Sequence, residues 1–224
     1  MTPAIVLLSG GLDSATVLAI AQSQGFEPIA LSFRYGQRHA IEIDAARRIA
    51  AARNVREHHI VDIDLRSIGG SSLTADIAVP KNRSSAEIAA DLRIPSTYVP
   101  ARNTIFMSFA LAWAEVRGAV DIFVGINAID YSGYPDCRQV FYEAYQNVVE
   151  LGTRPETTIA IITPVSQMSK GDIVEAGIRL AAPLHLTWSC YKSESVACGR
   201  CDSCALRLRG FHKAGATDPI PYQE

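Results

Sequence analysis

Short apolar runs alternate along the chain with longer segments in which apolar residues recur every three or four positions. The first half of the chain predicts strands at 4–8, 28–33 and 59–63 and helices at 13–24 and 41–53. In the second of these helices, Ile41, Ala45 and Ile49 fall on one stripe. Because buried strands alternate with helices, we expect a parallel sheet covered by helices on both faces.

The periodic pattern weakens between residues 67 and 100, where Gly69-Gly70 and three prolines interrupt the chain. A long irregular stretch inside a compact domain is typically functional or mobile. Regular elements then return, with helices predicted at 104–116, 136–150 and 170–180, strands at 121–125 and 159–162, and Ser169 as N-cap of the last helix. The predicted fold class is α/β with a doubly wound parallel sheet. We expect the tail after Gly215 to be loose.

Composition narrows the class of protein. The 224 residues suffice for one α/β domain, or for one domain and a small appendage. A formal net charge of −2 argues against binding nucleic acid through bulk charge. The apolar run 107–113 is far shorter than the roughly 20 residues of a membrane-spanning helix. The N-terminus has no basic region of a signal peptide, so we expect a cytoplasmic protein.

The segment 9–14, SGGLDS, follows the first predicted strand and opens the first predicted helix. Its two glycines allow a tight turn and a close approach to a ligand. The helix start offers free N–H groups and a positive dipole end, which suit phosphate. The alternative is an ordinary glycine turn. The Walker pattern is absent, so the loop has no lysine for the β- and γ-phosphates.

SGGLDS resembles the PP-loop of the ATP pyrophosphatase family. This resemblance implies an adenine nucleotide alpha hydrolase-like fold and cleavage of ATP to AMP and pyrophosphate, with Mg²⁺ accompanying the ATP. The loop would hold the leaving pyrophosphate. The family's ATP-binding stretch is wider than the motif and corresponds here to Leu8, Ser9, Gly10, Gly11, Leu12, Asp13, Ser14, Ala15, Thr16, Val17 and Leu18.

Two further polar segments lie at predicted strand ends or helix starts, where open α/β sheets bind ligands. In the first, Arg102 offers a planar cationic fork for a carboxylate or phosphate. In the second, SGYPDCR at 132–138, Asp136 together with the preceding Asp130 can accept hydrogen bonds from a guanine-like base. Either Tyr131 or Tyr134 can stack on that base. From residue types alone, a simple turn followed by a helix cap is the favoured explanation of the second segment.

The segments YGQRH at 35–39 and SGYPDCR at 132–138 are similar to those of the 7-cyano-7-deazaguanine synthase family. Arg34 departs from the acidic residue of many members. The resemblance implies an ATP-dependent ligase that joins 7-carboxy-7-deazaguanine and ammonia through adenylated intermediates, in the synthesis of a queuosine precursor. It implies a homodimer acting on small molecules, without direct contact to nucleic acid or membrane. The site residues it implies are Arg102 and Lys170 as catalytic groups and Asp130, Tyr134, Asp136 and Arg138 as substrate contacts.

Four cysteines crowd near the C-terminus, at Cys190, Cys198, Cys201 and Cys204. Two overlapping C-x-x-C steps can close a tetrahedral Zn²⁺ site with no open position, which makes the site structural. An iron–sulfur cluster also takes four cysteines, and the spacing leaves this alternative open. The family resemblance favours zinc. We therefore expect a PP-loop domain at 1–185 and a small zinc module with a tail at 186–224.

Lys170 opens the predicted helix at 170–180, where PP-loop enzymes often place a basic residue for the ATP phosphates. A solvated lysine at a helix end is the equal alternative. Two other functions compete with the ligase. A PP-loop enzyme that modifies tRNA would carry a tRNA-binding domain or a basic face, and a nucleotide sensor would bind ATP without releasing pyrophosphate.

Overall fold

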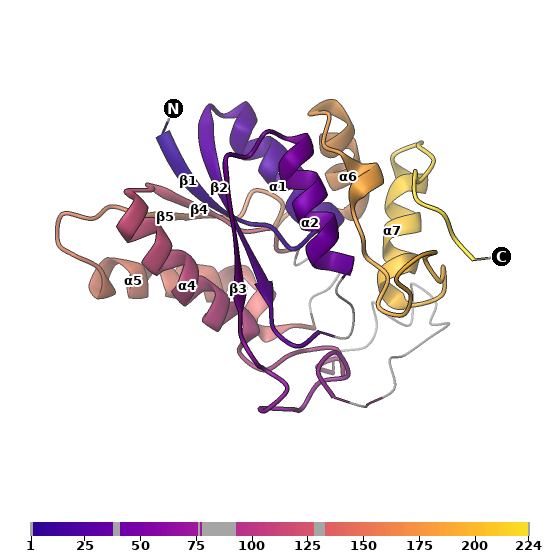
Figure 1. Ribbon diagram of the computed structural model, residues 1–224, viewed down its shortest axis with the longest axis horizontal. Coiled ribbons are helices and arrows are strands. Elements are labelled where there is room, and N and C mark those ends of the chain that lie inside the picture. The colour runs from indigo at the N-terminus through magenta and orange to yellow at the C-terminus, as the bar shows by residue number, and fades with distance from the viewer. Residues whose placement is uncertain (1, 38–40, 76, 78–92, 128–132, 224) are drawn as a thin grey trace.

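The fold is built around a parallel sheet whose five strands have the order β3-β2-β1-β4-β5 (Figure 1). The computed structural model describes residues 2–37, 41–75, 77, 93–127 and 133–223. The strands are β1 (Thr2–Leu7), β2 (Phe26–Arg34), β3 (Glu57–Asp62), β4 (Asp121–Phe123) and β5 (Ala160–Ile162). The strand order reverses between β1 and β4, which confirms the predicted doubly wound class.

Helices cover both faces of the sheet (Figure 1). They are α1 (Leu12–Ser23), α2 (Ile41–Ala52), α4 (Arg102–Arg117), α5 (Gln139–Gly152), α6 (Lys170–Arg179) and α7 (Asp202–Lys213). Alternate residues of β1 supply the two cores, since successive side chains of a strand point to opposite faces. Ala4 and Val6 pack with α1, α2 and α6, whereas Ile5 packs with α4 and α5.

The predicted elements are confirmed to within a few residues, with one informative shift. The helix expected from residue 136 begins at Gln139, because Pro135–Cys137 forms a separate 3₁₀ turn. Ser169 caps α6 as predicted: its side chain accepts from the N–H of Asp172, whose carboxylate accepts from the N–H of Ser169. No helix in the described residues is both long and apolar enough to cross a membrane.

The C-terminal region was incompletely predicted. The cysteines are followed by α7, a helix that packs on α6. The expectation of a loose tail after Gly215 is wrong. Ile220 is buried, and the backbone of 197 pairs with that of 221–223 beside the cysteines. The apolar and hydrogen-bonding partners of this tail come from the cysteine module.

The irregular stretch 67–100 is described only in part. Ser72 N–H donates to the carbonyl of Ser96 at 2.7 Å, which joins its two described ends. Leu73 and Val99 are buried in the core beneath α4. The side chains expected at Arg38, His39 and Asp130 lie outside the described residues.

Candidate active site

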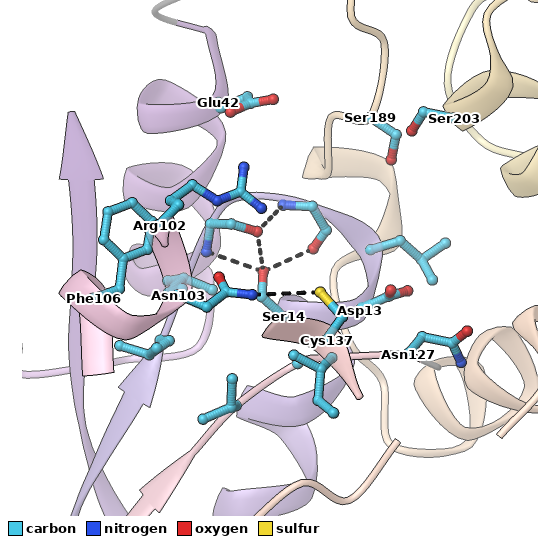
Figure 2. Close-up of a pocket in the computed structure, with 18 of the residues that line it drawn as sticks. Asp13, Ser14, Glu42, Arg102, Asn103, Phe106, Asn127, Cys137, Ser189 and Ser203 are labelled. Carbon is cyan, nitrogen blue, oxygen red and sulfur yellow. Dashed lines mark hydrogen bonds between the residues drawn. The ribbon is translucent and has the colours of Figure 1, made fainter. Parts of the chain in front are cut away.

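A cavity of about 320 Å³ opens at the carboxyl ends of β1, β2 and β4, beside the point where the strand order reverses. Its wall combines the loop after β1, the start of α4, the segment after β4 and the region around the cysteines (Figure 2). Ligands of open α/β sheets bind at this position. The predicted polar segments therefore meet in one place, although they are spread over more than a hundred positions in sequence.

The loop after β1 is held by hydrogen bonds of its two serines. Ser14 Oγ donates to the carbonyl of Gly11 at 3.1 Å and lies 3.1 Å from Ser9 Oγ. The N–H of Gly11 donates to Ser9 Oγ at 3.3 Å. Leu8, Ser9, Gly11, Leu12, Asp13 and Ser14 line the cavity. The start of α1 faces that cavity without a side-chain cap, which is the arrangement that favours an anion.

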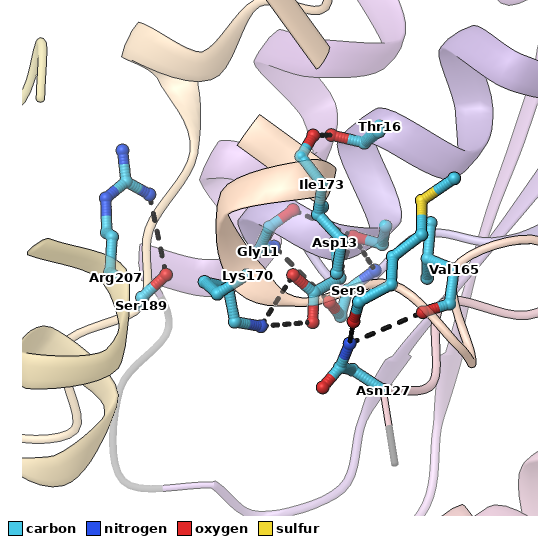
Figure 3. A network of polar contacts seen from close by, with 12 residues as sticks. Ser9, Gly11, Asp13, Thr16, Asn127, Val165, Lys170, Ile173, Ser189 and Arg207 are labelled. Carbon is cyan, nitrogen blue, oxygen red and sulfur yellow. Dashed lines mark hydrogen bonds and ion pairs between the residues drawn. The ribbon is translucent and has the colours of Figure 1, made fainter. Parts of the chain in front are cut away.

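The last four residues of the predicted ATP-binding stretch, 15–18, lie inside α1 and away from the cavity wall. Ala15, Val17 and Leu18 are buried in the core between the sheet and α6. Thr16 Oγ1 donates to the carbonyl of Ile173 in α6 (Figure 3). These four residues therefore anchor the helix whose first turn carries the loop.

Two glycines permit backbone contacts at this loop that a side chain would block. Gly10 has a φ of +86°, and a Cβ on it would lie 2.1 Å from the carbonyl oxygen of Glu42 in α2. A Cβ on Gly125, in the segment after β4, would lie 3.1 Å from the backbone nitrogen of Ser14. The loop is thus packed against backbone on two sides.

Lys170 reaches the loop from the first position of α6. Its Nζ lies 2.8 Å from both carboxylate oxygens of Asp13 (Figure 3). The two side chains are 15% and 23% exposed, and both line the cavity. Lys170 is therefore largely buried and engaged with a carboxylate, and it is not a solvated helix-end lysine.

Arg102 begins α4 on the opposite side of the cavity (Figure 2). Its Nη1 donates to the hydroxyl of Tyr35 at 3.3 Å, and its guanidinium lies 5.6 Å from the centre of the same ring. Burial raises the pKa of Tyr35, so this phenol stays neutral and offers no counter-charge. Among the described residues, no carboxylate lies within ion-pair distance of Arg102.

Aromatic and neutral groups surround Arg102. The ring of Phe33 stacks on that of Phe106 with centroids 3.9 Å apart. Tyr134 lines the cavity, and its hydroxyl lies 2.6 Å from Thr97 Oγ1. Burial raises the pKa of the Cys137 thiol to about 12, so that thiol is protonated near neutral pH. This end of the cavity presents flat apolar surfaces beside one cation.

The other predicted substrate contacts are placed less directly. Asp136 is buried and does not line the cavity; its Oδ2 accepts from the N–H of Asn103 at 3.1 Å, so it caps α4 next to Arg102. Arg138 is exposed, and its Nε donates to the carbonyl of Pro135. Asp130 lies outside the described residues.

The four predicted metal ligands come together. The Sγ atoms of Cys190, Cys198, Cys201 and Cys204 lie within 4.8 Å of one another, and all four residues are buried. Tetrahedral zinc at 2.3 Å from each sulfur needs sulfurs about 3.8 Å apart, so the cluster is close to that size. Backbone N–H groups of Lys192 and Cys198 donate to Cys190 Sγ at 3.4 Å, which favours a thiolate. The site fits a tetrahedral metal.

Several cavity residues were not predicted as functional. Asn127 donates to the carbonyls of Val165 and Met168, which ties the segment after β4 to the turn before α6 (Figure 3). Ser189, Ser203 and Arg207 enter the wall from the cysteine module. Their only sequence signal was proximity to the cysteines, because a serine or arginine without a motif reads as solvated surface.

Comparison with known proteins identifies the family of the chain. A sequence model of the family described as Queuosine biosynthesis protein QueC matches residues 3–215. The chain is 59% identical over 226 residues to the 7-cyano-7-deazaguanine synthase of Kineococcus radiotolerans, covering 99% of this chain and 98% of that one. It is 58% identical to the synthase of that name from Paramagnetospirillum magneticum, covering 99% of both chains. Among solved structures, an NMN synthetase from Francisella tularensis aligns over 96% of this chain and 73% of its own, with 17% identity and a TM-score of 0.47.

Proposed function

The chain belongs to the Queuosine biosynthesis protein QueC family, and from this membership we propose that it is an ATP-dependent carbon–nitrogen ligase. It converts 7-carboxy-7-deazaguanine and ammonia to 7-cyano-7-deazaguanine. The observation that supports this most directly is the single cavity with an anion-binding loop and Lys170 on one side and Arg102 on the other. The curated relatives of the same length carry the name of this activity.

On the nucleotide side, the start of α1 and the loop at 8–14 bind the β- and γ-phosphates of ATP. Lys170 exchanges its contact with Asp13 for one with phosphate, while Asp13 turns to the Mg²⁺ that accompanies ATP. Both groups are within 2.8 Å of each other and face the cavity, so the exchange needs only side-chain rotation. Backbone N–H groups that already point at the ligand need no reorganisation during the reaction.

The reaction proceeds by two adenylations. A carboxylate oxygen of the substrate attacks the α-phosphorus of ATP and expels pyrophosphate, giving an acyl adenylate. Ammonia attacks the acyl carbon, loses a proton and displaces AMP, which gives the amide. The amide oxygen attacks a second ATP and again expels pyrophosphate. Loss of both protons from nitrogen and of AMP from carbon then forms the nitrile.

On the substrate side, Arg102 binds the negative charge of the substrate carboxylate. It also binds the negative charge of the α-phosphate that this carboxylate attacks. The rings of Phe106 and Tyr134 provide flat surfaces for the deazaguanine. Asp136 supports Arg102 through the cap that it makes to the N–H of Asn103. Asp130 and Arg138 remain proposed substrate contacts from the family resemblance. No covalent nucleophile is required, because positioning and charge stabilisation suffice for adenylation.

We also propose zinc as the metal of the four-cysteine cluster, with a structural role, since four thiolates leave no open position. The chain acts as a cytoplasmic homodimer, with the PP-loop domain at 1–185 and the zinc module at 186–224. Metal analysis of purified protein tests the first point: one zinc per chain and no visible absorption support it. A brown protein with iron and acid-labile sulfide excludes it.

The decisive experiment measures pyrophosphate release from ATP with Mg²⁺ and ammonia, with and without 7-carboxy-7-deazaguanine, and identifies the product by mass spectrometry. We expect release that depends on the carboxylate, two pyrophosphates per nitrile and an amide that appears transiently. Release that depends on tRNA instead would contradict the proposed substrate. Binding of ATP without any release would assign the chain to the nucleotide sensors.

A further inference from the structure

Arg207 of α7 is a cavity-lining arginine that the proposed reaction leaves without a role. Its side chain is 2% exposed. Each of its five N–H donors has an acceptor. Nε and Nη2 donate to the carboxylate of Asp218 at 2.7 and 2.9 Å. Nη1 donates to Thr187 Oγ1 at 2.6 Å and to Ser189 Oγ at 3.5 Å, and Nη2 also donates to the carbonyl of Leu184 at 3.2 Å.

The counter-charge comes from the C-terminal tail. Asp218 is 3% exposed, and its Oδ2 also accepts from the hydroxyl of Tyr222 at 2.6 Å. The backbone of Gln223 donates to the carbonyl of Ala197, which fastens the tail beside the cysteines. Arg207 is thus held from one side by the tail and holds the segment 184–189 on the other.

The segment 184–189 in turn contacts the phosphate-binding loop. The N–H of Trp188 donates to the carbonyl of Gly10 at 2.9 Å. On its other side Gly10 touches the backbone of α2, where even a Cβ would overlap the carbonyl oxygen of Glu42. The loop backbone at Gly10 is therefore confined between Trp188 and α2. A shift of residues 187–189 therefore displaces the backbone at Gly10, and with it the N–H groups of residues 10–13.

Helix α7, which carries Arg207, also confines Lys170. A Cβ on Gly210 of α7 would lie 2.5 Å from Cγ of Lys170, and a Cβ on Gly171 would lie 2.8 Å from Cδ of Lys213. Lys213 Nζ donates to Ser169 Oγ at 2.7 Å, at the cap of α6. Two routes therefore run from α7 to the phosphate-binding groups, one through residues 184–189 and one through the start of α6.

We propose that Arg207, paired with Asp218, is a positioning residue that sets the phosphate-binding loop through the Trp188–Gly10 contact. Its donors are all engaged and its charge is neutralised, so it does not bind phosphate itself. The cysteine cluster begins the helix that carries Arg207, which makes the C-terminal module part of the nucleotide site. This inference rests on the proposed role of the loop in binding ATP.

The test uses the full-length, zinc-loaded Arg207→Lys variant, since lysine keeps the charge but cannot supply five donors in a fork. Hydrogen–deuterium exchange is followed in the peptides that cover 8–14 and 184–190. Affinity for Mg²⁺-ATP is measured by calorimetry, and zinc content by metal analysis. We expect faster exchange in both peptides, an ATP affinity about tenfold weaker, and an unchanged zinc content. The KM for 7-carboxy-7-deazaguanine stays within about twofold.

Val149→Ala is the matched control, because Val149 is buried in the core on the opposite face of the sheet and touches no part of the loop. Its melting temperature falls, but exchange at 8–14 and ATP affinity stay as in the wild type. Tyr222→Phe provides a milder second variant, since it removes only the hydroxyl that donates to Asp218.

Two results overturn the inference: exchange that increases at 184–190 but not at 8–14, or a control that loses ATP affinity as much as Arg207→Lys. Wild-type protein that binds no ATP refutes the proposed function instead. In that case the exchange data still decide whether Arg207 positions the loop.

Discussion

The two ends of the cavity each carry an arginine, and the structure provides them with different surroundings. Arg207, at the cysteine end, has five acceptors, two of which are the oxygens of a buried carboxylate. Arg102, at the aromatic end, has one hydrogen bond at 3.3 Å, to a neutral phenol, and is partly exposed to the cavity. Both guanidinium groups are permanently charged.

This difference separates a structural role from a ligand-binding role. A buried cation whose donors are all satisfied has nothing left to offer a substrate, and its removal leaves an unpaired carboxylate. A cation that faces a cavity with most donors unsatisfied by the described residues is suited to an anion that arrives later. Changes at the cysteine end should therefore reduce stability most, whereas changes at the aromatic end should reduce the reaction rate most.

The largest effect is expected from Asp218→Ala, which leaves the Arg207 charge buried without a partner. Breaking a buried ion pair from one side costs about 3–5 kcal/mol of unfolding free energy. For a chain of this length that lowers the melting temperature by about 6–20 °C, measured by thermal unfolding at fixed zinc. Asp62→Ala is the control, since its pair with Arg34 is exposed. Equal melting temperatures for the two variants would refute the large contribution to stability that we assign to the Arg207–Asp218 ion pair.

Arg102→Met should reverse that pattern. We expect the rate of substrate-dependent pyrophosphate release to fall by about 10²–10³-fold, as for removal of a preorganised charge-stabilising donor. The unfolding free energy should change by about 1 kcal/mol or less, because only one hydrogen bond among the described residues is lost. Steady-state kinetics and chemical denaturation measure the two quantities. A large loss of stability with an unchanged rate would assign Arg102 to the scaffold.

Tyr35→Phe sharpens the comparison, since it removes only the hydroxyl that accepts from Arg102. One hydrogen bond contributes about 0.5–1.5 kcal/mol, so we expect the rate to fall by about two- to tenfold. The ring remains, and with it the cation–π contact at 5.6 Å. A rate as low as that of Arg102→Met would show that the phenol acts on the substrate directly.

The smallest effect is expected from Cys137→Ala, although this thiol also lines the cavity. Burial raises its pKa to about 12, so it carries no charge at neutral pH and is no nucleophile. We expect the rate to change by less than about threefold between about pH 6 and about pH 9. Complete loss of activity, with a normal fold, would demand a covalent role for Cys137.

Local patterns in the sequence determined the strand–helix order, the glycine turn after β1 and the cysteine cluster. A buried strand, a glycine turn and two C-x-x-C steps can each be recognised from a few neighbouring residues, because the residues that define them are close in sequence. Ser169 belongs to this group, because its capping partner Asp172 is only three positions away. These features were therefore predictable without knowledge of the fold, and the doubly wound class follows from their order.

Contacts between distant segments could not be predicted in this way. Asp136 was expected to bind a base or cap the following helix, yet it caps α4, more than thirty positions earlier in the chain. Only the structure shows that Lys170 is largely buried beside Asp13 and not solvated at the helix end. In sequence, an acid or a lysine near a helix start has the same appearance whichever partner it finds.

The two arginines separate what the sequence predicts from what only the tertiary structure shows. A sequence motif singled out Arg102, whereas no motif includes Arg207 or Asp218 in the tail. Its burial depends on Asp218, and its influence on Gly10 passes through Trp188, so three separate segments must be folded together first. The sequence by itself determined which chemical groups the protein carries. The tertiary structure decided which charges are neutralised by the protein and which remain for a ligand, because that depends on distances between segments far apart in the chain.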